Sequence, residues 1–107
     1  NLINGCANIT GGGLADNIKR IIPENLIAEI DLNKVKTSKI FKWLKKNNIS
    51  DKEMINTFNC GVGFCIIVKK NNVNKIKKYF TKDYQPYQIG YISNTKKRFN
   101  FSKNIKW

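Results

Sequence analysis

Histidine is absent from the 107-residue sequence, and cysteine and proline are scarce, with 3 and 2 residues respectively. Without histidine, these residues cannot form a serine–histidine–aspartate triad, supply a histidine base or bind a metal through imidazole. The cysteines form no CxxC pair, so we expect the free thiols of a reducing compartment. Cys60 and Cys65, if both lay on one strand, would point to opposite faces and could not share a metal.

Long apolar runs are also missing. No run reaches the roughly 20 residues that a membrane-spanning helix requires, and no signal-peptide pattern opens the chain. We therefore expect a cytoplasmic protein with no membrane partner. The sequence begins at Asn1 and not at methionine, which suggests a fragment of a longer polypeptide, although 107 residues are enough for one small domain.

Acidic residues are few, since 7 Asp and Glu stand against 20 Lys and Arg, giving a net charge of +13. This excess favours a polyanionic partner, either a phosphate ligand or a nucleic acid. Lys and Asn recur along the whole chain, as in Lys45–Asn48, so a compositional bias is the preferred explanation and a nucleic-acid partner is not expected. The acidic residues form no DxD or ExxH pair, so no metal site is predicted.

Two of the expected elements are well specified. Ser50–Glu53 has the pattern of a capping box, with Ile49 and Met54 placed as a hydrophobic staple around the start of a helix. Every residue of Val62–Val68 except Gly63 is apolar. Such a run is typical of a central strand that is covered on both faces.

The remaining patterns complete an order of β-α-β-α-α-β-α-β-β, which predicts an α+β fold with a single mixed sheet and packed helices. They are a strand near 7–9, a helix with Leu14, Ile18, Ile21 and Ile22 that Pro23 stops, a half-buried strand over Leu26–Leu32, a helix capped by Thr37 or Ser38 that carries Ile40, Phe41 and Leu44, a helix with Val73, Ile76 and Phe80, a strand with Tyr87, Ile89 and Tyr91, and a short strand with Phe99 and Phe101.

Several aromatic side chains could stack on nucleic-acid bases, but they lack the interleaved spacing of a recognition sheet. We expect them instead to pack in the core. They are Trp43, Tyr84, Tyr87, Tyr91 and Trp107.

The first candidate site is the run Thr10, Gly11, Gly12 and Gly13, which leads directly into a predicted helix. Glycines allow a sharp turn and close approach of a ligand, and a helix start offers free N–H groups to a phosphate. A plain tight turn explains the same glycines equally simply. No Gly-Lys-Ser/Thr follows, so the loop is not a Walker loop.

The second candidate site is the stretch Thr57–Phe64, which contains Asn59, Cys60, Gly61 and Gly63. Alternating glycines at the entry to a buried strand indicate that a ligand or another backbone passes close to it. Close packing of strand against helix is the simpler alternative. Cys60 has no histidine to activate it, so we expect a packed and unreactive thiol.

Five stretches, in chain order, match the sequence pattern of one enzyme family. They are Ala7–Leu14 with Asp16–Ile18 and Arg20 (pattern AHITGGGL-x-ENIPR), Ile21–Asp31 (VLPEGLGAEID), Ile40–Leu44 (IFRWL), Glu53–Gly63 (EEMxRTFNCGVGM) and Ile89–Gly90 (IGxI). The chain thus resembles the carboxy-terminal part of the phosphoribosylformylglycinamidine cyclo-ligases, or AIR synthetases. The TFNCGVG run distinguishes this family from other enzymes of the fold.

The resemblance implies that residues 1–107 are an incomplete carboxy-terminal domain, with an absent amino-terminal domain that binds most of the ATP and forms a homodimer. The implied reaction closes the imidazole ring of purine biosynthesis, converting formylglycinamidine ribonucleotide to aminoimidazole ribonucleotide with ATP and Mg²⁺. This chain alone would be inactive. The implied residues are Asn8 for catalysis and Thr10, Gly11, Gly12, Gly13, Asn59 and Gly61 for substrate or phosphate binding.

One departure concerns Asn8, where the family usually has histidine. Asparagine donates and accepts hydrogen bonds but cannot exchange a proton near neutral pH. Two alternatives to the enzyme therefore stay open. One is a non-catalytic interaction or regulatory module of the same fold, and the other is a small basic nucleic-acid-binding domain.

Overall fold

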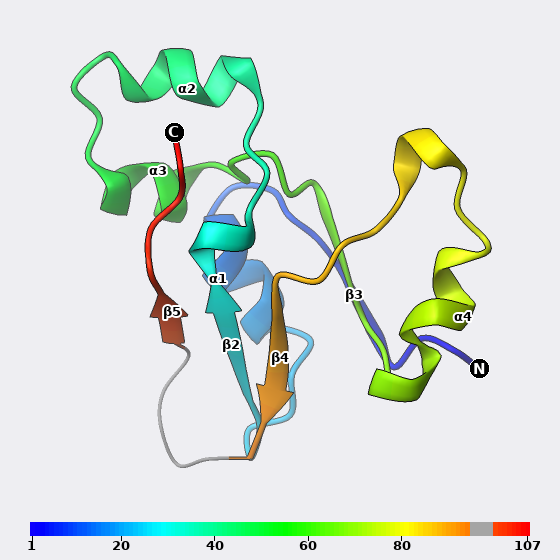
Figure 1. Ribbon diagram of the computed structural model, residues 1–107. Helices are drawn as coiled ribbons and strands as arrows, with labels where there is room; N and C mark the ends of the chain where they lie inside the picture. Colours follow the sequence, from blue (N-terminus) through cyan, green and yellow to red (C-terminus); the bar gives the residue numbers. More distant parts are fainter. Residues whose placement is uncertain (95–99) are drawn as a thin grey trace.

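Figure 1 shows the computed structural model, which describes residues 1–94 and 100–107. The order β-α-β-α-α-β-α-β-β is confirmed, with short 3₁₀ turns between some elements. The elements are β1 (Gly5–Asn8), α1 (Gly13–Lys19), β2 (Ile27–Asp31), α2 (Lys39–Lys45), α3 (Asp51–Thr57), β3 (Phe64–Ile67), α4 (Val73–Lys77), β4 (Gly90–Ser93) and β5 (Asn100–Ser102), and the turns are η1 (Leu32–Lys34), η2 (Lys70–Asn72) and η3 (Lys82–Tyr84). Phe99, expected in the last strand, lies outside the described residues.

The α+β class is confirmed, but the described strands form two sheets where the sequence pattern predicted one. β1 and β3 make an antiparallel pair, while β4, β2 and β5 form a mixed sheet in that order. The expectation of a central strand over Val62–Val68 is wrong, because β3 pairs only with β1 among the described strands and Phe64 is 59% exposed. An apolar pattern predicts that a strand is buried, but it does not show which segment buries it.

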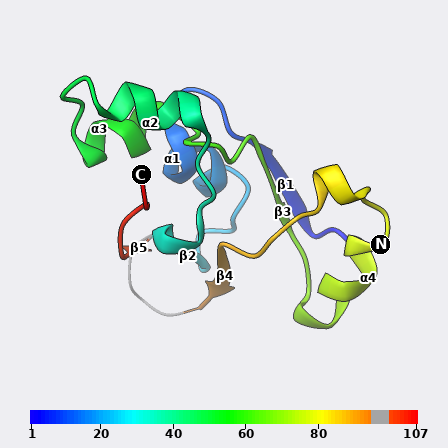
Figure 2. The ribbon, with the colours of Figure 1, turned by 45° about the horizontal axis from the view of Figure 1, so that its top comes forward.

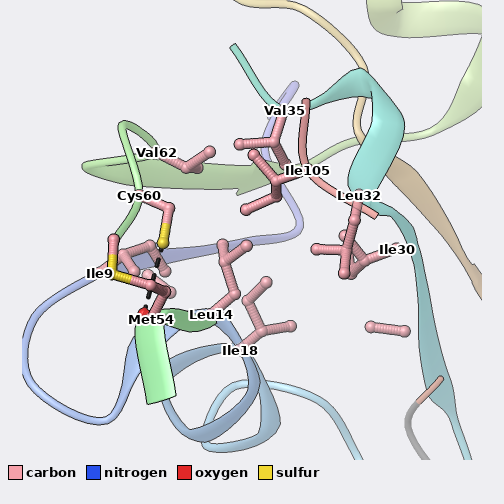
Figure 3. Packing of buried hydrophobic residues seen from close by; sticks show 12 residues of the cluster. Ile9, Leu14, Ile18, Ile30, Leu32, Val35, Met54, Cys60, Val62 and Ile105 are labelled. Carbon is pink, nitrogen blue, oxygen red and sulfur yellow. Dashed lines mark hydrogen bonds between the residues drawn. The ribbon is translucent and has the colours of Figure 1, made fainter. Parts of the chain in front are cut away.

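The core lies between α1, α3 and the inner faces of the two sheets (Figure 3). Leu14 and Met54, from α1 and α3, are among the most deeply buried side chains. The expected half-buried strand is confirmed, since Ala28 and Ile30 of β2 are buried while Glu29 between them is half-buried. Burial of such apolar side chains is the main favourable contribution to the stability of the fold.

The helices differ in how well side chains satisfy the free backbone N–H groups at their starts. The capping box of α3 is confirmed: the Ser50 hydroxyl accepts from Glu53 N at 3.2 Å, and the Glu53 carboxylate accepts from Ser50 N at 3.2 Å. Ser38 lies at the start of α2 but its side chain makes no capping hydrogen bond there. No residue of α2 is buried, and Trp43 is 60% exposed. α2 is therefore held to the core only by half-buried contacts.

The expectation that the aromatic side chains pack in the core holds for Trp107 and is wrong for three others. Trp107 packs against the core and donates from Nε1 to Asp51 Oδ1 at 3.2 Å. Trp43, Tyr84 and Tyr91 are 60%, 78% and 61% exposed. These three side chains lie where the described chain offers nothing large enough to cover them. None of the described helices has the length and apolar character needed to cross a membrane.

Candidate functional site

The two sequence motifs meet in space. Ile9, between Asn8 and the glycine loop, donates from its N–H to the carbonyl of Gly63 at 2.9 Å. Gly13 lies against the backbone of Ile55 and Phe58 at the end of α3. Loop 10–13 and turn 58–63 are thus held side by side by backbone contacts between α1, α3 and the β1–β3 pair.

Asn17 holds the glycine loop in shape. This buried side chain on α1 donates from Nδ2 to Gly13 O at 2.7 Å and to Thr10 O and Gly11 O at 3.3 Å each. Its Oδ1 accepts from the Thr10 hydroxyl at 3.3 Å. A buried amide with so many partners ties the carbonyls of Thr10, Gly11 and Gly13 to one side chain and so fixes the shape of the loop.

Asn17 lies within the family pattern, but the pattern does not indicate a role for it. The available signal is its position between Leu14 and Ile18 on the apolar face of the helix, where a polar residue is buried. A buried polar side chain requires partners, and the glycine loop before α1 supplies carbonyls for Asn17.

The three glycines of the loop have different surroundings. Gly13 has φ +67° and its missing Cβ would coincide with the Ile55 carbonyl, so it permits α1 to pack on α3. Gly12 has φ +93°, and a Cβ there would lie 2.9 Å from Asp16 Oδ2. Gly11 has no neighbour within 4 Å of such a Cβ and faces open space. Of the three loop glycines, Gly11 alone therefore has open space where a side chain would stand.

The Asn59–Gly61 turn is built by local hydrogen bonds. Asn59 Oδ1 accepts from Gly61 N at 2.9 Å, which fixes the turn. Gly61 has φ +105° and its missing Cβ would lie 2.7 Å from the Lys36 carbonyl. The simpler alternative, close packing of strand against helix, is wrong in its partner at Gly61, because the backbone that Gly61 contacts is the segment before α2.

Cys60 is a packed thiol, as its lack of an activating histidine predicted. It is 1% exposed and its Sγ donates to Met54 O at 3.4 Å (Figure 3). Burial, with a smaller effect from the negative charge of Asp51, raises the pKa of the Cys60 thiol to about 11. Because the thiolate is the nucleophilic form, this environment disfavours covalent catalysis by Cys60.

The exposed part of the site is formed by Asn8, Thr10 and Gly11. Asn8 ends β1 opposite Phe64, and its side chain makes no hydrogen bond within residues 1–94 and 100–107. In the same described part of the chain, the N–H groups of Gly11 and Gly12 have no acceptor. Two backbone donors beside a free amide suit an anionic or carbonyl oxygen, although Asp16 beside Gly12 confines an anion to the Gly11 side.

A magnesium site is not formed by the described residues, which contain no group of three His, Cys, Asp or Glu side chains placed to share a metal. Asp16 is the acidic residue nearest the loop, and a single carboxylate does not make a Mg²⁺ site without further oxygen ligands.

The site thus defines a class of module: an α+β domain that presents two glycine-bearing segments at the end of a β-ribbon, the first held by the buried amide of Asn17 and the second by Asn59. Residues 1–100 match the model of the family described as AIR synthase related protein, C-terminal domain. The chain therefore belongs to this family.

Individual relatives agree with the family match. The chain is 41% identical over 105 residues, 96% of its length, to the phosphoribosylformylglycinamidine cyclo-ligase of Prochlorococcus marinus strain NATL2A. It is 37% identical over 92 residues, 84% of its length, to the enzyme of the same name from Neisseria gonorrhoeae. It spans only 30% and 27% of the length of these two relatives.

Proposed function

We propose that the chain is the carboxy-terminal part of an ATP-dependent cyclo-ligase that converts formylglycinamidine ribonucleotide to aminoimidazole ribonucleotide, with ADP and phosphate as the other products. The observation that carries the proposal is 41% identity to a phosphoribosylformylglycinamidine cyclo-ligase across 96% of the chain. The remaining part of such an enzyme would supply the amino-terminal domain, most of the ATP site and the homodimer contact.

In this proposal the exposed edge of the site binds the substrate. The free N–H groups of Gly11 and Gly12 would donate to an oxygen of the substrate or its phosphate, and Asn8 would orient the reacting amide by hydrogen bonds. Asn17 would act as a positioning residue, because it sets the loop through the carbonyls of Thr10, Gly11 and Gly13. Asn59 and Gly61 would shape the adjoining turn without touching the substrate.

ATP supplies the energy of ring closure in this reaction class by making the formyl oxygen a leaving group. The described residues do not fit a Mg²⁺ ion, and no step of this chain is assigned to one. What the chain contributes is the placement of the substrate, an effect that can supply several kcal/mol of the barrier reduction.

The test is a chimera in which this chain replaces the matched stretch of the Prochlorococcus marinus cyclo-ligase. We expect ADP formation that depends on formylglycinamidine ribonucleotide, together with an imidazole product. Hydrolysis of ATP that is indifferent to the substrate, in a chimera that folds, would contradict the proposal.

A loop variant tests the site within the same chimera. Gly11→Leu should lower kcat/KM by about tenfold or more, because the side chain occupies the open face, while the melting temperature changes little. Lys52→Leu adds the same side chain to the exposed surface of α3 and is the matched control. Equal kinetics of the two variants would exclude the loop from the substrate site.

A non-catalytic module of the same fold is the second candidate, and Asn8 favours it. An amide at this position cannot transfer a proton near neutral pH. The chimera separates the candidates, since a non-catalytic module would fold into it without restoring turnover.

A further inference from the structure

A groove of about 1070 Å³ opens between β3 and α4 on one side and β4 on the other. Figure 1 and Figure 2 show β3 and β4 as neighbours that belong to different sheets. The floor is apolar, with Ile18, Ala28 and Ile30 among its lining residues. An apolar groove of this size within so small a domain is typical of a binding surface.

β3 has one edge that faces away from its partner. Ile9 and Gly63 are opposite residues joined by a hydrogen bond, with Ile9 N donating to Gly63 O at 2.9 Å. Opposite pairs alternate in an antiparallel ladder, so the pairs of Phe64 and Ile66 are the non-hydrogen-bonded ones. The N–H and C=O groups of Phe64 and Ile66 therefore point away from β1.

β4 presents a similar edge. Asp31 N donates to Ile89 O at 2.8 Å, so the same alternation turns the backbone groups of Gly90 and Ile92 away from β2. The carbonyl of Gly90 accepts from the side chain of Gln88 at 3.1 Å, as expected for a strand edge with no neighbouring strand. Both walls of the groove thus carry backbone groups suited to pairing with an added strand.

Side chains around the groove point to the nature of the occupant. Phe64, Tyr84 and Tyr91 line it and are 59%, 78% and 61% exposed. Lys69, Lys70 and Lys77 also line it. An occupant would therefore be apolar along its length and acidic at its flanks.

The overall dimensions agree with an open structure. The radius of gyration is 14.1 Å, above the roughly 13 Å typical of a compact domain of this length. The chain spans only 27 to 30% of the length of the relatives it matches, so most of a family protein is available to cover the groove.

We propose that the groove receives an extended segment from the part of the family protein that this chain does not span, and that the segment pairs as a β-strand with the free edge of β3, β4 or both. Strand addition supplies backbone hydrogen bonds, while the apolar floor binds alternate side chains. The two small sheets would then become parts of a larger one. This inference does not depend on the proposed reaction.

The experiment compares amide hydrogen exchange, residue by residue, in the isolated chain and in the Prochlorococcus marinus chimera. In the chimera we expect exchange at least about tenfold slower at Phe64 and Ile66, at Gly90 and Ile92, or at both pairs. Cys65, whose N–H already faces β1, is the internal control and should change less. This alternation is the signature of an added strand, and it is independent of whether the chimera has activity.

Three results would overturn the proposal. Unchanged exchange would show that the groove stays open, and equal slowing at Phe64, Cys65 and Ile66 would show cover without strand pairing. Slowing in the isolated chain that rises with its concentration would show that a second copy is the occupant.

Two variants provide a separate check. Phe64→Asp should lower the yield of folded chimera and should not destabilise the isolated chain, because Phe64 is largely exposed there. Trp43→Asp changes a side chain with the same exposure on α2, outside the groove, and should leave the chimera folded. Equal behaviour of the two chimeras would contradict the proposal.

Discussion

The two halves of the molecule differ in how completely they are packed. In one half, α1 lies on α3 and the glycine loop is tied down by Asn17. In the other half, β3, α4 and β4 surround an open groove, and the side chains of Phe64 and Tyr91 are mostly exposed. Figure 2 shows α1, α2 and α3 gathered together, with α4 and the β1–β3 pair on the other side of the molecule.

The difference teaches which features this chain determines by itself. The candidate site lies at the boundary, where β1 and β3 leave the packed half, and its loop geometry is set by contacts within the chain. The groove half has apolar surface and strand edges that the described residues do not cover. The predictions below separate the two halves by substitutions that should act on one of them only.

The largest effect is expected at Gly13. Gly13→Ala should destabilise the chain by about 4 kcal/mol, because a methyl group at φ +67° would collide with the Ile55 carbonyl. Gly11→Ala is the matched control, with open space around it, and should change stability by less than about 0.5 kcal/mol. Urea denaturation followed by circular dichroism measures both. Similar midpoints would show that the α1–α3 contact is not a fixed part of the packed half.

This contrast also marks what the sequence could predict. The order of elements, the capping box at Ser50 and the packed thiol at Cys60 follow from local patterns, and each is found. The division of the strands into two sheets could not be predicted. The apolar pattern of Val62–Val68 is the same whether this chain or another segment covers the strand.

The candidate site was predictable as two motifs but not as one arrangement. Thr10–Gly13 and Asn59–Gly61 are both visible as glycine-bearing turns, yet only tertiary packing assigns Gly13 and Gly61 to backbone contacts and leaves Gly11 open. The role of Asn17 depends on three carbonyls that meet only in the folded loop. No local sequence pattern predicts that these three carbonyls lie close together.

The second largest effect is expected at Asn17. Asn17→Ala should destabilise the chain by about 2 to 3 kcal/mol, since it removes at once all the hydrogen bonds by which the buried amide holds the loop to α1. Asn47→Ala removes an exposed amide that donates to Trp43 O at 2.8 Å, and should have an effect of about 0.5 kcal/mol or less. Thermal unfolding monitored by calorimetry compares them. If Asn17→Ala were no worse than Asn47→Ala, the loop would not depend on the buried amide.

An effect of similar size, confined to alkaline pH, is expected from Cys60. Its pKa is raised from 9.0 to about 11 by burial, so the unfolded chain loses this proton first as pH rises. The neutral thiol therefore contributes full stability below pH 9, which is lost between pH 9 and about 11, at about 1.4 kcal/mol per pH unit.

The measurement is the pH dependence of the urea midpoint between pH 9 and 11 for the parent, Cys60→Ala and Cys6→Ala. Cys60→Ala should make the decline shallower without abolishing it, because burial also raises the pKa of the Cys65 thiol to about 11. Cys6→Ala changes an exposed thiol and should leave the decline unaltered. An unaltered slope in Cys60→Ala would place the Cys60 thiol in contact with water and weaken the distinction between the packed half and the open half.

The smallest effect is expected at Asn8, which lies on the boundary between the two halves. General acid–base catalysis typically contributes about 10²- to 10⁴-fold in rate, whereas one neutral hydrogen bond is worth about 1 kcal/mol, or roughly fivefold. Asn8 is exposed and its side chain has no partner within the described residues, so it is free to bind a substrate but has nothing to orient a proton transfer.

We therefore expect Asn8→His in the chimera to change kcat by less than about tenfold. The pH–rate profiles of both forms decide the matter, because a histidine that transfers a proton adds a limb near pH 6 to 7. A gain of about a hundredfold with that limb would mean that the parent lacks its proton-transfer group, which would favour the non-catalytic module over the enzyme.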